Sequence, residues 1–168
     1  ATITRLCPNL PVPVARKLKP GDKIRVGYIS RNVFRQAVPY YMMNRVIHHD
    51  RSKFEVFVFS LAERTDDFTE IFITNCDHFS HFTDLKNFAA IINSVLASKL
   101  DILIFTDIGM DVVTYILSGL RMAPIQCALV GHGTTSGMPT IDYYLSGDFE
   151  TENAENQYRE KLVRLPNA

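Results

Sequence analysis

Residues 23–30, Lys-Ile-Arg-Val-Gly-Tyr-Ile-Ser, begin with alternating charged and apolar side chains and then become apolar at successive positions. Side chains alternate between the two faces of a strand, so a run that is apolar throughout is buried on both faces. The same pattern recurs at residues 53–60 (KFEVFVFS) and 101–106 (DILIFT). Strands of this kind are typical of a parallel sheet covered by helices on both faces.

Helical and strand patterns alternate along the rest of the chain. Residues 87–99 give the clearest helical pattern, with Phe88, Ile91, Ile92, Val95 and Leu96 on one face. Further helices are expected at 37–49, 66–74, 111–120 and 151–160, and further strands at 78–82, 125–130, 141–146 and 162–165. We therefore predict an α/β fold with a Rossmann-like, doubly wound, mostly parallel sheet over residues 23–168. Residues 1–22 contain four prolines and are predicted to be a Pro-rich linker.

The composition excludes several classes of protein. Among the 168 residues, 18 basic side chains balance 18 acidic ones, so neither nucleic acid nor an anionic membrane is expected as a partner. The apolar runs are too short to span a bilayer, and residues 1–5 do not resemble a signal peptide. Cys7, Cys76 and Cys127 are widely spaced, which favours buried free thiols in a reducing, cytoplasmic compartment over a disulfide framework.

Three loops, 30–36, 106–111 and 131–139, follow predicted strands. In an open α/β sheet, ligands bind beyond the carboxyl ends of the strands, so these loops are expected to share one edge. Asp107 either belongs to a site at this edge or caps the following helix. Asp142 interrupts an apolar strand and needs a partner if it is buried, and a structural role is expected for both aspartates. His78 and His81 have no cysteine nearby, and no metal site is expected.

The loop Gly131-His132-Gly133-Thr134-Thr135-Ser136-Gly137 is the most polar of the three. Glycine amides can turn toward an anion and the hydroxyls add donors, so a phosphate or a sugar hydroxyl is a suitable ligand. The loop matches neither a Walker A motif nor GxGxxG, and a simple chain-reversing turn is the alternative. His132 could carry a proton or contact a phosphate, or be a solvated side chain.

Seven segments resemble one family in sequence and in order. They are KIRVGYIS, HDRSKFEVFVFS, HFTDL, DILIFTD, APIQCALVGHGTTSG, IDYYLSGD and QYREKLVRLP, between residues 23 and 167. The chain is similar to the O-linked N-acetylglucosamine transferases, which include SPINDLY-type proteins. The resemblance implies one half of a GT-B fold, the N-terminal, acceptor-side half, joined upstream to tetratricopeptide repeats. A nucleotide sugar, expected to be UDP-N-acetylglucosamine, would be bound mainly by the second half, and no other cofactor is implied.

The resemblance also implies roles for individual residues. His81 and Gln36 would lie near the acceptor, and the loop from Gly131 to Gly137 would line the donor side of the cleft. The family carries a histidine where this chain has Gln36, and glutamine exchanges hydrogen bonds but no proton near neutral pH. Gly133 stands where many relatives have proline, and the usual Asp-Gly-x-Thr reads Asp107-Ile108-Gly109-Met110 here.

Two functions from different classes fit these observations. The first is the acceptor-side half of a protein O-glycosyltransferase that acts on Ser or Thr, with the acceptor peptide and the nucleotide sugar as partners. The second is a non-catalytic module that binds proteins or peptides through the same edge. A dinucleotide-binding protein is the weaker idea, because no GxGxxG follows the first strand. The isolated chain is expected to lack turnover, and its exposed inner face favours dimerisation.

Overall fold

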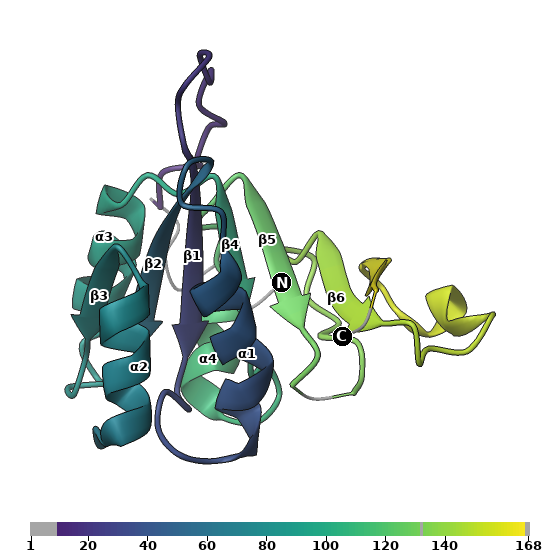
Figure 1. The fold of residues 1–168 in the computed structure, drawn as a ribbon. Coiled ribbons are helices and arrows are strands. Elements are labelled where there is room, and N and C mark those ends of the chain that lie inside the picture. Colours follow the sequence, from purple (N-terminus) through teal and green to yellow (C-terminus); the bar gives the residue numbers. More distant parts are fainter. Residues whose placement is uncertain (1–9, 132, 167–168) are drawn as a thin grey trace.

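The computed structural model describes residues 10–131 and 133–166, which form a seven-stranded sheet with the order β3-β2-β1-β4-β5-β6-β7 (Figure 1). All six strand pairs are parallel. The strands are β1 (Ile24–Ser30), β2 (Phe54–Ser60), β3 (His78–His81), β4 (Ile102–Phe105), β5 (Ile125–Leu129), β6 (Tyr143–Gly147) and β7 (Lys161–Leu165). The predicted α/β fold with a doubly wound sheet is confirmed.

Helices cover both faces of the sheet, as predicted. They are α1 (Ala37–His48), α2 (Asp67–Asn75), α3 (Phe88–Ala97) and α4 (Val112–Ser118). Met42 of α1 and Phe72 of α2 pack in one hydrophobic cluster, whereas Ile91 of α3 and Leu117 of α4 pack in another. Figure 1 shows α1 in front of β1 and β4, α2 in front of β2 and β3, and α4 behind the sheet. The strand order reverses between the neighbouring strands β1 and β4, and the helices that follow these two strands lie on opposite faces. This position is therefore the switch point of the sheet.

Acidic or amide side chains cap the amino termini of three of the helices. Asp66 accepts hydrogen bonds from the Phe68 and Thr69 amides at the start of α2, and Asn87 caps α3. Asp111 caps α4, so the alternative that Asp107 caps this helix is wrong. Asp111 takes this role because it directly precedes the first helical residue, which leaves the Asp107 side chain free for other contacts.

The prediction of a helix at 151–160 is also wrong. The structure has only a short 3₁₀ helix, η2 (Ala154–Gln157), followed by β7. Ala154 is the one buried residue of η2, so the segment has no apolar stripe that could hold a longer helix against the sheet. Glu160, at the end of the expected helix, turns inward and is only 5% exposed.

Residues 10–16 lie against the amino-terminal edge of the sheet. The Arg16 guanidinium makes two hydrogen bonds to the Asp101 carboxylate, at 2.9 and 2.5 Å, and Leu10 packs against the core. Beyond Arg16 the chain projects past the sheet and turns back at residues 19–22, where the Asp22 amide donates to the Lys19 carbonyl (Figure 1). The part of the predicted linker that the structure describes is therefore anchored to the domain by an ion pair. None of the described helices is long and apolar enough to cross a membrane.

Candidate functional site

The carboxyl ends of β1, β4 and β5 bring three loops together at the switch point. Ile29 pairs with Phe105 in the parallel register, so Ser30 and Thr106 lie side by side where the two strands end. The chain then leaves β1 toward α1 on one face and leaves β4 toward α4 on the other. The carboxyl edge beside this divergence is where open α/β sheets bind their ligands.

Asp107 lies two residues beyond the end of β4 at this edge of the sheet and is fully buried. Its Oδ2 atom accepts hydrogen bonds from Ser30 Oγ at 3.0 Å, from the Arg31 amide at 2.9 Å and from Asn32 Nδ2 at 2.8 Å. Burial, together with the nearby charge of Asp111, raises the pKa of the Asp107 carboxyl to about 7, although the three hydrogen bonds oppose the shift. Asp107 therefore ties the loop after β1 to the end of β4.

Three buried polar atoms on the loops at this edge have no hydrogen-bond partner within the described residues. They are Asp107 Oδ1, Thr106 Oγ1 and Gln36 Nε2. Gln36 immediately precedes α1 and does not use its side chain to cap the helix. Buried polar groups are almost always paired in folded proteins, so three orphans on neighbouring loops mark a place with unused hydrogen-bonding capacity.

Gly131 packs against the end of β4 from the β5 side. A Cβ atom at this position would lie 2.0 Å from the Thr106 carbonyl oxygen and 3.7 Å from the Val38 side chain near the start of α1. Only glycine fits here, because any side chain would push apart the loops after β4 and β5. Gly131 thus allows the first turn of the polar loop to touch the end of β4.

The second half of the polar loop is held by Glu160. Its carboxylate accepts hydrogen bonds from Thr135 Oγ1 at 2.6 Å, from the Ser136 amide at 2.9 Å and from the Ser136 hydroxyl. Burial opposes ionisation of Glu160, but the hydrogen bonds from Ser136 and Thr135 outweigh it and lower the pKa of this carboxyl. The hydroxyls of Thr135 and Ser136 are therefore directed at Glu160, and Gly137 has a φ of +65°, which suits the following turn.

Two described residues between these anchors lie at the surface. A Cβ at Gly133 would meet no atom within 4 Å. Thr134 is exposed. His132 lies outside the described residues. The loop is thus anchored at Gly131 and at Ser136, with Gly133 and Thr134 exposed between these two positions.

His81 ends β3 at the same edge of the sheet. Its Nε2 atom lies 2.8 Å from the Ala62 carbonyl oxygen, and the imidazole is exposed. Ser30, Ser60 and His81 are register partners on β1, β2 and β3, so His81 is two strand spacings, about 10 Å, from Ser30. Gln36, on the loop after β1, and His81, at the end of β3, therefore lie at the same carboxyl edge of the sheet, and the Gln36 Nε2 atom has no hydrogen-bond partner among the described residues.

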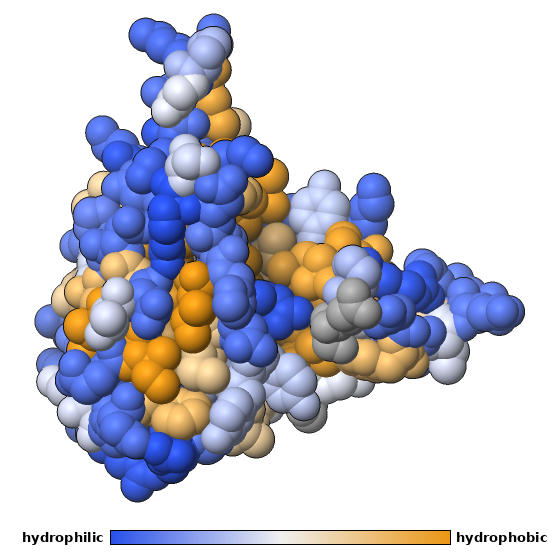
Figure 2. All heavy atoms as spheres, viewed as in Figure 1, coloured by the Kyte–Doolittle hydropathy of each residue, from blue (hydrophilic) through white to orange (hydrophobic). Residues whose placement is uncertain are grey.

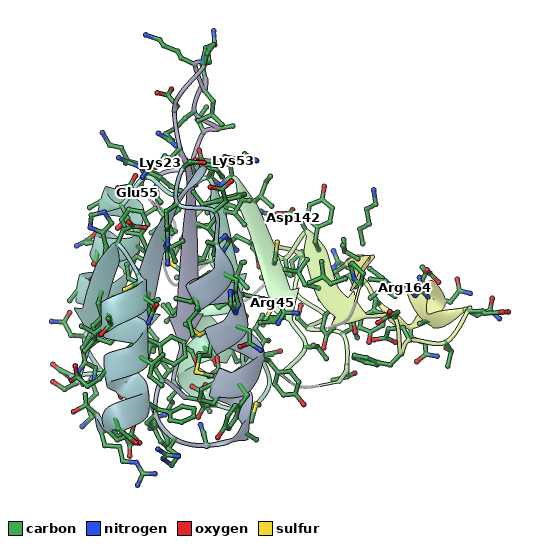
Figure 3. The ribbon with its side chains drawn as sticks, viewed as in Figure 1. Lys23, Arg45, Lys53, Glu55, Asp142 and Arg164 are labelled. Carbon is green, nitrogen blue, oxygen red and sulfur yellow. The ribbon has the colours of Figure 1, made fainter. Side chains whose placement is uncertain are left out.

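The opposite, amino-terminal edge holds residues with structural roles. Asp142 accepts two hydrogen bonds from Arg121, at 2.6 and 3.0 Å, and a third from the Gln126 amide (Figure 3). The buried Gln126 side chain bonds the Met122 amide and the Leu120 and Thr140 carbonyls. The structural role expected for Asp142 is confirmed, because its partner is Arg121. No group of three or more metal-ligating side chains occurs among the residues that the structure describes.

Sequence patterns missed two parts of this site. The Ser30–Asn32–Asp107 cluster joins residues more than 70 positions apart, and only the position of Asp107 after an apolar run hinted at it. Glu160 gave no signal, since it stood in a segment expected to be helical.

The order of the parallel strands and the helices on both faces define a Rossmann-like α/β half-domain. The family model for glycosyl transferase family 41 matches residues 6–168, so the chain belongs to glycosyl transferase family 41. The family and the GT-B half predicted from the sequence are thereby confirmed.

Related proteins and a solved structure agree with this family. The chain is 28% identical over 158 residues to a tomato (Solanum lycopersicum) protein named probable UDP-N-acetylglucosamine–peptide N-acetylglucosaminyltransferase SPINDLY, covering 89% of this chain and 16% of that protein. It is also 28% identical over 152 residues to the UDP-N-acetylglucosamine–peptide N-acetylglucosaminyltransferase of Caenorhabditis elegans, covering 87% of this chain and 13% of that protein. A mutant O-GlcNAc transferase from Thermobaculum terrenum superposes with a TM-score of 0.78 at 26% identity, over 96% of this chain and 32% of that one. The chain thus spans under a fifth of these curated relatives.

Proposed function

We propose that the protein to which this chain belongs is a peptide N-acetylglucosaminyltransferase, and that the chain forms its acceptor-side half. The transferred group would be N-acetylglucosamine, and the acceptors would be Ser or Thr hydroxyls of proteins in the cytoplasm. The family supports this proposal, as do the names of the tomato and nematode relatives. The observation that carries it is the group of three unpaired buried polar atoms on the loops that follow β1 and β4 at the switch point.

Gln36 and His81 have complementary roles in this proposal. The unpaired Gln36 Nε2 donates a hydrogen bond to an oxygen of the bound substrates, which orients the acceptor hydroxyl. His81 is exposed at the same edge, and a neutral imidazole can accept a proton as that hydroxyl attacks the sugar. Asp107 acts through the loop after β1, because its three hydrogen bonds hold residues 30–32 and hence the path to Gln36.

The loop from 131 to 137 forms the donor-side wall. Its exposed residues Gly133 and Thr134 lie between two anchors, Gly131 on the Thr106 carbonyl and Ser136 on Glu160. The Gly133 amide and the Thr134 hydroxyl can stabilise the charge that develops on the leaving diphosphate. A second half-domain would bind the nucleotide and close the cleft against water.

The test uses the complete protein, a panel of nucleotide sugars and a library of Ser- and Thr-containing peptides, with intact mass as the readout. We expect a mass increase of one N-acetylhexosamine with UDP-N-acetylglucosamine and its loss in the His81→Ala variant. Lys86→Ala, on an exposed loop, is the matched control and should transfer normally. Absence of both transfer and donor binding by calorimetry, with any of the nucleotide sugars, would instead favour the non-catalytic binding module.

A further inference from the structure

A groove lies away from the candidate site, on the sheet face that carries α1. Its volume is about 580 Å³. Its lining residues are Tyr28, Tyr40, Tyr41, Asn44, Arg45, His48, His49, Ile104, Leu145, Leu165 and Pro166. One wall is α1, the other is the end of β7, and the floor is formed by β1, β4 and β6.

The groove exists because no described helix covers β6 on this side of the sheet. α1 and α2 share a hydrophobic cluster with β1, β2, β4 and β5, whereas no helix of the described residues lies in front of β6 (Figure 1). Tyr143 and Leu145 of β6 are only partly buried as a result. Figure 2 shows hydrophobic surface in this hollow beside α1. Because parallel sheets are covered on both faces, the uncovered strand provides a seat for one more helix.

The groove also carries positive charge without a matching acid. Arg45 projects from α1 toward β5 (Figure 3), and its Nη1 atom donates to the Tyr41 carbonyl on its own helix. No carboxylate pairs with Arg45 among the described residues, and none of the lining residues is acidic. Burial lowers the pKa of the Arg45 guanidinium, which means that the charge is partly desolvated without compensation. His48 and His49 add two imidazoles to the same wall.

We propose that this groove docks an acidic amphipathic helix of a partner protein. An apolar stripe on the helix would cover Ile104 and Leu145, and a Glu or Asp at its edge would pair with Arg45. A helix that runs alongside the 12 residues of α1 needs about 12 to 15 residues to fill the groove. The inference is independent of the proposed function, because the groove lies on the face of the sheet and the candidate site lies at its carboxyl edge.

The probe is a synthetic 14-residue helix with a Leu stripe flanked by Glu, labelled for fluorescence anisotropy and titrated with the 168-residue chain. The matched probe carries Lys at every Glu position. We expect the Glu peptide to bind at least 10-fold more tightly than the Lys peptide, with an affinity that falls as salt rises. Arg45→Glu should weaken the Glu peptide at least 10-fold and strengthen the Lys peptide, whereas Lys86→Glu, outside the groove, should change neither.

Each alternative outcome overturns the proposal. Equal affinities for the two peptides, or no measurable binding of either, would mean that the groove selects no acidic helix. A dimer in analytical ultracentrifugation that Arg45→Glu dissociates would make a second copy of the chain the occupant. Arg45→Gln and thermal unfolding of every variant separate loss of binding from loss of folding, since Gln removes the charge without introducing repulsion.

Discussion

Ser136 donates both its backbone amide and its hydroxyl to the carboxylate of Glu160, 24 residues further along the chain. This pair fixes the second half of the polar loop to the segment that leads into β7. The same carboxylate also accepts from Thr135. The conformation of the polar loop at residues 131–137 therefore depends on Glu160, a buried acid that lies outside this loop.

Glu160→Gln should lower the free energy of unfolding at pH 7 by about 2 kcal/mol, because hydrogen bonds to a charged acceptor are stronger than those to an amide. The pKa of Glu160 is lower in the folded chain than in the unfolded one. Its stabilising effect is therefore complete above the unfolded pKa of about 4.3 and disappears as the pH falls through the lower folded value. Urea unfolding of both proteins between pH 2 and 8 measures this, and a difference that stays constant with pH would contradict the assignment.

Asp107 should give the opposite pH dependence. Its folded pKa is raised to about 7, above the unfolded value of about 3.9, so the folded chain holds this proton more tightly. The contribution of Asp107 to stability is then greatest below pH about 4, falls as the pH rises to about 7, and is level above that. Subtracting the stability of Asp107→Asn from that of the unmodified chain at each pH isolates this slope, because the amide does not titrate.

Removing the Asp107 side chain tests its structural role. Asp107→Ala leaves the donors on Ser30, Arg31 and Asn32 without their acceptor, at a cost of about 3 kcal/mol or more. Chemical denaturation gives the value. Ser30→Ala, which removes one donor and leaves the other two, is the comparison and should cost clearly less. An equal loss in the two variants would show that the cluster does not act as a unit.

Gly131 and Gly133 form a matched pair for testing the packing of the polar loop. Gly131→Ala places a methyl group 2.0 Å from the Thr106 carbonyl oxygen and should destabilise the domain by about 3 kcal/mol. Gly133→Ala meets no atom within 4 Å and should change stability by less than about 1 kcal/mol. Thermal unfolding of the two variants side by side measures the contrast, and similar melting temperatures would refute the close approach of the two loops.

Substitutions of Gln36 in the complete protein test whether this residue contributes to sugar transfer. Gln36→Ala should lower kcat/KM about 10- to 100-fold, because it removes a positioned hydrogen-bond donor. Gln36→His keeps a donor at this place and should retain more activity than the alanine variant. Steady-state transfer to one peptide, followed by mass spectrometry, measures both. Unchanged kinetics in Gln36→Ala would remove this residue from the cleft.

The sequence by itself determined the fold and the family. Strands such as 23–30 and 101–106 are apolar on both faces, and that property is local, so the parallel sheet follows from it directly. The helix over 87–99 was equally clear, since its stripe of five apolar residues repeats at helical spacing. Seven segments in a characteristic order were enough to indicate the O-linked N-acetylglucosamine transferases, because the order of segments is a property of the chain and does not depend on how it folds.

Tertiary structure alone decided the contacts within the site. Glu160 was expected in a helix, yet it turns inward because the polar loop supplies three donors to it from a distant part of the chain. Asp107 was one candidate cap for the next helix, but Asp111 caps it, and Asp107 instead binds residues 30–32 across the switch point. Periodicity reports which face of an element is apolar. It carries no information about which distant polar groups a buried carboxylate will meet, and those partners fix the loops of this site.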